Sequence, residues 1–186
     1  MELHPSVDPR FHRHIHRTYL PDATYFVTTY VRHRREFFLN PDIARIVEET
    51  IWHERTSRFI IYAYVVMPDH LHLLLQPTCK TISNIMQSLK SNSCREINRY
   101  LQDPHNGECA LAVMGIGHDE PIHDNHARFA WQKSFYDHVI KDDKDFRTHV
   151  EYIRYNPVKA GLCWKPEDYP FLYIDEKAIG KILTGE

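Results

Sequence analysis

Two histidines interrupt an apolar segment in the first half of the chain. His70 and His72 lie between Tyr62 and Gln76, where most other residues are hydrophobic. Alternate side chains of a β-strand point to the same face, so the two imidazoles would project together, about 7 Å apart along the strand. A polar group buried without a partner costs roughly 1–3 kcal/mol, so the pair needs partners. Two adjacent imidazoles can bind one metal ion, which then needs at least one further protein ligand.

A second group with chemically useful spacing lies about 80 residues later. Tyr152 and Asn156 are four residues apart in a segment of helical periodicity, and His149 lies one turn earlier. Residues at this spacing share a helix face, so a phenol, an amide and an imidazole would project together. A phenol is a weak nucleophile at its usual pKa of about 10, but a divalent cation can promote its attack on a phosphate. Tyr155 is the rival nucleophile, although it points about 300° around the helix from Tyr152.

Both groups depend on the elements that carry them. Segments rich in β-branched, aromatic and aliphatic residues predict strands, and apolar residues at helical spacing predict helices. Asn40 and Pro41 mark the start of the first helix, as its cap and its first helical residue. The expected strands are 24–31, 59–66, 71–75 and the end of 129–140, and the expected helices are 41–55, 81–101 and 141–156, the last closed by Pro157.

The order of these elements is βαββαβα. This alternation predicts an α/β fold, an α+β sandwich of split βαβ or ferredoxin-like character, with helices packed on a mixed or antiparallel sheet. Tyr152 would lie on the last long helix, and the histidine pair would open the strand at 71–75. We expect one domain, 1–186, with its core at about 19–162, a loop excursion at 103–128 and a C-terminal tail at 163–186.

Composition narrows the classes of function. The chain has 186 residues and a formal net charge of −2, so no global basic field predicts a nucleic-acid partner. Its first residues do not begin a signal peptide, and no apolar stretch approaches the roughly 18 residues of a membrane helix. The four cysteines are widely spaced and form no CxxC pair, which argues against a zinc ribbon. We therefore expect a soluble cytoplasmic protein with reduced thiols and no membrane partner.

Basic residues are nevertheless concentrated in places. The first 35 residues hold an excess of arginine, and the polar face of the helix at 81–101 carries further basic side chains. Such a patch either contacts nucleic-acid phosphates or is solvated surface. Lys159 directly follows the Tyr152 helix and would lie near any DNA bound there. The candidate DNA contacts are Arg10, Arg13, Arg32, Arg34, Arg35, Lys90, Arg95 and Lys159.

Three segments, in this order, resemble the REP-associated tyrosine transposases, a branch of the single-tyrosine HUH transposases. The first contains His70-Leu71-His72, and the last contains Tyr152 and Asn156. His-hydrophobic-His alone occurs by chance, whereas the ordered set is specific. The matching segments are 64–72, 131–138 and 149–162, and the resemblance spans roughly 19–161.

The resemblance implies a role for each residue of the two groups. Tyr152 would be the catalytic nucleophile, and His70, His72 and Asn156 would bind Mg²⁺ or Mn²⁺. His149 would be an alternative ligand or a group that faces the phosphate. The wider superfamily has Gln where this chain has Asn156, so the amide here is one methylene shorter.

The resemblance also implies a reaction and a partner. The reaction is metal-dependent cleavage and joining of single-stranded DNA through a 5′-phosphotyrosine intermediate, without ATP. The partner is a single-stranded DNA hairpin of the REP palindrome type, which places the protein at nucleoid DNA. We expect a monomer rather than a homodimer whose subunits exchange the Tyr152 helix.

Other functions fit parts of the sequence. A histidine-triad hydrolase would need a third histidine at position 74, which is Leu74. A zinc hydrolase would require Asp69 or Glu151 to complete the site. The main alternative is a metal-dependent nuclease, or a module that binds hairpin DNA or RNA without strand transfer.

Overall fold

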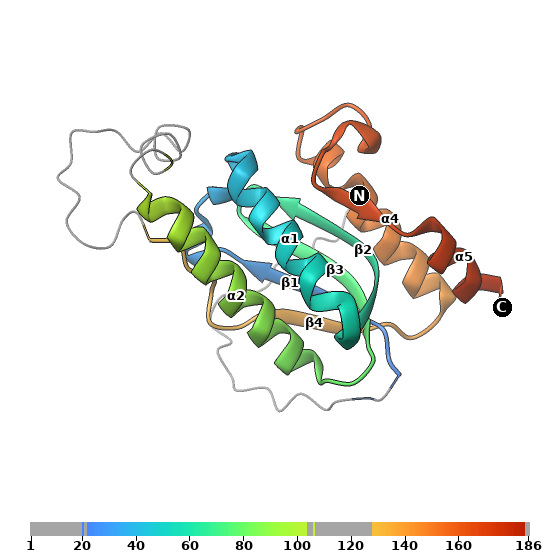
Figure 1. Cartoon of the computed structure of the whole chain (residues 1–186). Helices are drawn as coiled ribbons and strands as arrows, with labels where there is room; N and C mark the ends of the chain where they lie inside the picture. Colours follow the sequence, from blue (N-terminus) through green and yellow to red (C-terminus); the bar gives the residue numbers. More distant parts are fainter. Residues whose placement is uncertain (1–19, 21, 104–105, 107–127, 185–186) are drawn as a thin grey trace.

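A computed structural model describes residues 20, 22–103, 106 and 128–184 (Figure 1). The elements follow the predicted order βαββαβα and then continue with one more strand and one more helix. In chain order they are β1 (Tyr25–Tyr30), η1 (Arg32–Arg34), η2 (Phe37–Leu39), α1 (Pro41–Arg58), β2 (Phe59–Met67), β3 (His70–Pro77), α2 (Ile82–Gln102), β4 (Tyr136–Val139), α4 (Asp143–Lys159), η3 (Pro166–Asp168), β5 (Leu172–Ile174) and α5 (Glu176–Thr184).

The strands form a single five-stranded sheet in the order β4-β1-β3-β2-β5. Every neighbouring pair is antiparallel. Strands β1 and β2 therefore run in the same direction, are joined through α1, and are separated by β3, which is the split βαβ arrangement. The predicted fold class is confirmed, with an antiparallel rather than a mixed sheet.

Helices cover both faces of the sheet and divide the core in two. On one face α1 and α2 lie side by side (Figure 1) and pack on residues such as Val27 and Leu73. On the other face α4 and α5 pack through Ile153 and Ile179 on residues such as Leu74. Because side chains alternate along β3, His70 and His72 share the α4 face with Leu74. The sheet topology therefore brings the histidine pair beneath the helix that carries Tyr152.

The boundaries of the long helices follow their caps. The Asn40 side chain accepts the backbone N–H of Asp42 at 2.9 Å, as its sequence position predicts. The prediction that Pro157 ends the last long helix is wrong, because α4 continues to Lys159. Proline at this position removes only one backbone donor from the final turn. The chain leaves the helix through Ala160 and Gly161, whose φ of +72° is readily adopted only by glycine.

The predicted C-terminal tail contributes to the sheet. Strand β5 pairs with the edge of β2, where Tyr64 lies opposite Tyr173. The Tyr169 hydroxyl donates to the carbonyl of Val66 at 2.8 Å. Helix α5 buries Ile179 against the α4 side of the sheet. Most of the predicted excursion at 103–128 lies outside the described residues, as do Arg10 and Arg13. Among the helices that are described, none is both long and apolar enough to cross a bilayer.

Candidate active site

The histidine pair lies in the middle of the sheet, at the start of β3. His72 is opposite Thr28 of β1 and Val65 of β2, and only 3% of its surface is exposed. The Nε2 atoms of His70 and His72 are 3.1 Å apart. Two nitrogen ligands about 2.1 Å from one cation, at roughly 90°, would be about 3.0 Å apart. The spacing of the pair therefore suits two ligands of a single ion.

Partners at Nδ1 determine which nitrogen of each imidazole faces the site. His70 Nδ1 lies 2.5 Å from Asp69 Oδ1. Burial works to raise the pKa of Asp69, but the hydrogen bond and charge of His70 and the charge of Arg34 outweigh it and lower this pKa. The ionised carboxylate can only accept, so His70 donates from Nδ1, and in the neutral form of the ring the lone pair is on Nε2.

Burial keeps His72 neutral. Burial, with smaller contributions from the charges of His70, Arg34 and His149, holds its pKa well below the usual range. Its Nδ1 lies 2.8 Å from the Thr28 hydroxyl oxygen, which can donate or accept. A neutral imidazole is the form that binds a metal ion.

Arg34 reaches this site through an unusual turn. Both His33 and Arg34 have left-handed backbone conformations, with φ of 60° and 55°. Such conformations cost of order 1–3 kcal/mol per residue outside glycine. The turn brings Arg34 Nε to 2.6 Å from Asp69 Oδ2 and its guanidinium to 4.0 Å from the centre of the Tyr30 ring. Arg34 thus holds the carboxylate that orients His70.

Tyr152 of α4 lies directly against His72, one of the histidine pair. Its ring makes edge-to-face contacts with His72, at 5.1 Å between centroids, and with Phe26, at 5.7 Å. Burial raises the pKa of the phenol, a hydrogen bond with Asn156 lowers it, and Tyr30 raises it, with a net increase. The phenol is therefore protonated at neutral pH. It is nevertheless 40% exposed, so a bound strand can reach it.

The structure distinguishes between the candidate nucleophiles on α4 and shows where the alternative metal ligand lies. Of the two tyrosines, Tyr152 is the one whose ring contacts His72. Tyr155 is 42% exposed and shares a surface groove with Tyr152 and Lys159. His149 was expected as an alternative metal ligand. Its Nδ1 lies 3.1 Å from Asp145 Oδ1, so this nitrogen faces Asp145. Its ring also contacts Phe26, at 4.5 Å.

The residues suggested for a zinc hydrolase have other partners. Asp69 accepts from His70 Nδ1, on the opposite side of the ring from the paired Nε2 atoms. Glu151 forms an ion pair with Arg154 at 3.2 Å. The structure therefore gives neither carboxylate the position of a third ligand beside the two Nε2 atoms.

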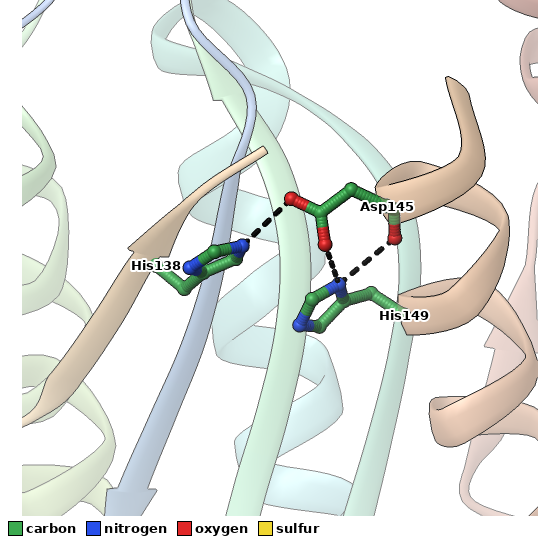
Figure 2. A group of neighbouring side chains, drawn as sticks. All are labelled: His138, Asp145 and His149. Carbon is green, nitrogen blue, oxygen red and sulfur yellow. Dashed lines mark hydrogen bonds and ion pairs between the residues drawn. The ribbon is translucent and has the colours of Figure 1, made fainter. Parts of the chain in front are cut away.

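The sequence did not indicate one further cluster, formed by His138, Asp145 and His149. Figure 2 shows both imidazoles directed at the Asp145 carboxylate, one from β4 and one from α4. Asp145 could be recognised as a residue of the first helical turn. His149, four residues later on the same helix, follows from helical spacing. The third member, His138, is found only when β4 is placed beside β1.

The candidate DNA-binding residues fall into two groups. Arg34 lies over the Tyr30 ring, and the Lys159 ammonium is 6.0 Å from the centre of the Tyr152 ring. Arg32 is exposed at the end of β1. Arg35 stacks over Phe37 at 5.0 Å.

Lys90 and Arg95 belong to α2, which covers the sheet face opposite α4. The Lys90 ammonium donates to the carbonyls of Gln132 and Ser134 at 2.5 and 3.0 Å, and Arg95 donates to Asn92 at 3.1 Å. Lys90 therefore holds the segment before β4 in place.

A family model, a similar protein sequence and a solved structure all relate this chain to transposases. The family described as "Transposase IS200 like" matches residues 20–108. The REP-associated tyrosine transposase of Escherichia coli strain K12 is 31% identical over 155 residues, which cover 83% of this chain and 78% of that protein. A solved structure of a REP-associated tyrosine transposase bound to a REP hairpin superposes with a TM-score of 0.61 and 27% identity, covering 84% of this chain and 79% of the other. Together with the His-Leu-His strand and the Tyr152 helix, these matches show that the chain belongs to the REP-associated tyrosine transposases.

Proposed function

We propose that this protein cleaves and rejoins single-stranded DNA beside a hairpin through a covalent bond to Tyr152. The contact of the Tyr152 ring with His72 is the observation that carries the proposal. It puts a partly exposed phenol beside two imidazoles whose Nε2 atoms are 3.1 Å apart. A nucleophile and a pair of cation ligands side by side are what phosphoryl transfer to a protein hydroxyl requires.

The chemistry is a transesterification in two directions. The Tyr152 oxygen attacks a backbone phosphorus, the bond from phosphorus to the 3′ oxygen breaks, and a 5′-phosphotyrosine and a 3′-hydroxyl result. The phenolic proton leaves to solvent, and the departing 3′ oxygen takes up a proton. Attack by a 3′-hydroxyl on the phosphotyrosine reverses these steps and joins two strands. One P–O ester bond forms for each that breaks, so the reaction needs no ATP.

The histidine pair fits a divalent cation. His70 and His72 would hold Mg²⁺ or Mn²⁺ through Nε2, with Asn156 as the third ligand. Such an ion, when bound, polarises the phosphate and neutralises developing charge. Asp69 and Thr28 keep the two imidazoles in the required orientation. Asn156 is hydrogen-bonded to Tyr152, and this bond opposes the rise in pKa of the phenol.

A hairpin is the partner that the relatives support. The solved relative is bound to a REP hairpin, and its fold superposes over most of this chain. Lys159 and Tyr155 line the same groove as Tyr152, which gives a strand at the nucleophile both a cation and an aromatic face. Arg32, Arg34 and Arg35 would contact the stem. We propose that one chain provides the whole site and acts on nucleoid DNA as a monomer.

Labelled DNA tests the proposed function directly. The full chain is incubated with Mn²⁺ and a single-stranded hairpin oligonucleotide labelled at its 5′ or its 3′ end. On a denaturing gel, the 3′ label should move with the protein and the 5′ label should remain on a free fragment. A nuclease without strand transfer would release both fragments uncoupled to protein, and that result would refute the proposal.

Asp69→Asn tests how the metal ligand is oriented. Removing the charge should weaken Mn²⁺ binding by about 10–100-fold, because Asp69 fixes the ring of His70 and increases its basicity. The measurement is the Mn²⁺ concentration that gives half-maximal cleavage. Asp168→Asn changes an exposed aspartate of η3 in the same way and should leave this concentration unchanged. Equal concentrations in both variants would show that Asp69 does not orient the ligand.

A further inference from the structure

A second cluster of metal-ligand side chains lies beside the proposed active site. His138 Nε2 is 2.7 Å from Asp145 Oδ2, and His149 Nδ1 is 3.1 Å from Asp145 Oδ1 (Figure 2). One ligand atom from each residue lies within 4.8 Å of the other two. The two imidazole rings stack at 4.9 Å between centroids. Three potential ligand atoms, from a strand and a helix, thus lie close enough together to reach one ion.

The donor set suits a cation of borderline softness. Two imidazoles and a carboxylate are typical ligands of Zn²⁺, whereas Mg²⁺ prefers oxygen ligands. Burial works to raise the pKa of Asp145, but hydrogen bonds from His138 and the Lys141 backbone, together with the charges of both histidines, outweigh it and lower this pKa. The carboxylate is therefore ionised at neutral pH, as a ligand must be.

Helix capping explains only part of this arrangement. The Asp145 backbone N–H donates to the cap residue Asp142 at 2.8 Å, and Asp145 Oδ2 accepts the Lys141 N–H at 3.0 Å. The cap uses Oδ2, whereas Oδ1 faces His149. A cation could take Oδ1 without breaking the cap. The cation would replace the present contacts of His138 Nε2 and His149 Nδ1 with the carboxylate. It would also cost the hydrogen bond between His149 Nδ1 and the Asp145 carbonyl, now 2.9 Å long.

We propose that His138, Asp145 and His149 form a structural site for Zn²⁺ or a similar transition-metal ion. Ligand atoms around a four-coordinate zinc are about 3.3–3.5 Å apart, so the observed 2.7 and 3.1 Å contacts need only small side-chain movements. Each histidine would carry its proton on the nitrogen that faces away from the ion. Solvent would supply the remaining position.

The site would hold the nucleophile's helix to the sheet. His138 lies on edge strand β4, and His149 lies one turn before Tyr152 on α4. The Phe26 ring contacts both His149 and Tyr152, at 4.5 and 5.7 Å. A cation bound by three residues from β4 and α4 would fix the start of α4 against the sheet. It would act on position and stability, apart from the ion that His70 and His72 are proposed to hold.

Zinc binding can be measured separately from DNA cleavage. The full chain carrying His70→Ala and His72→Ala is titrated with ZnCl₂, so that the proposed catalytic pair does not contribute. Adding His138→Gln should remove one Zn²⁺ equivalent, and His149→Gln should do the same. His53→Gln changes an exposed histidine of α1 and should remove none. At 100-fold excess of Zn²⁺ over its Kd, the melting temperature should rise by roughly 5–10 °C, and this rise should disappear with His138→Gln.

Both readouts compare variants that differ by one side chain. His138 is 39% exposed in its side chain, so His138→Gln should fold like its parent. If the number of Zn²⁺ equivalents and the melting shift are the same with and without His138→Gln, the site does not exist. Loss of the equivalent in His53→Gln as well would also overturn the proposal, since it would assign the zinc to other histidines.

Discussion

Tyr152→Phe should reduce strand cleavage and covalent adduct formation by at least about 10⁴-fold, because the phenyl ring has no oxygen to attack phosphorus. The substitution keeps the ring that contacts His72 and Phe26. It removes one atom from a side chain that is 40% exposed, so folding and hairpin affinity should change by no more than about twofold. Single-turnover cleavage of a labelled hairpin oligonucleotide, followed on a denaturing gel, measures the effect.

Tyr155→Phe is the matched control. Tyr155 lies on the same helix, lines the same groove and is 42% exposed. Losing its hydroxyl should leave the adduct intact, with at most a modest change in DNA affinity. An adduct that persists in Tyr152→Phe, or one that vanishes in Tyr155→Phe, would move the nucleophile to another residue.

Local periodicity is what made the two chemical groups predictable. His70 and His72 share a strand face because side chains alternate along β3, and Tyr152 reaches Asn156 because residues four apart share a helix face. Their meeting across about 80 residues follows from the order of the elements, since a split βαβ sheet puts β3 at its centre and the last long helix on its open face.

Contacts that depend on how the elements pack against one another could not be predicted in this way. His138 meets Asp145 only because β4 pairs with the edge of β1, and Lys90 meets the carbonyls before β4 across 42–44 residues. Arg34 reaches Asp69 because His33 and Arg34 both adopt left-handed backbone conformations, which neither residue type predicts. Strand β5 has three residues after a proline-containing segment, too short for alternation to be recognised.

Replacing His72 separates the site's chemistry from the stability of the sheet. His72→Ala should lower cleavage by at least about 10³-fold, since a metal contributes several kcal/mol to phosphoryl transfer and each 1.36 kcal/mol is tenfold in rate. It should also destabilise the fold, because it leaves the buried Thr28 hydroxyl without the partner now at 2.8 Å. An orphaned hydroxyl of this kind costs about 1–3 kcal/mol, in addition to the cost of the cavity.

A second substitution distinguishes the loss of cleavage from the loss of stability. Thr28→Val added to His72→Ala replaces both hydrogen-bonding partners with apolar groups, which can be nearly neutral for stability. The double variant should therefore regain the part of the unfolding free energy that was lost because the Thr28 hydroxyl had no partner, as measured by urea denaturation. Its cleavage should stay at the level of His72→Ala. If Thr28→Val restored cleavage as well, His72 would act only by supporting the sheet. If cleavage stays lost while stability returns, the requirement for His72 lies in its Nε2, the atom that faces His70 beneath Tyr152.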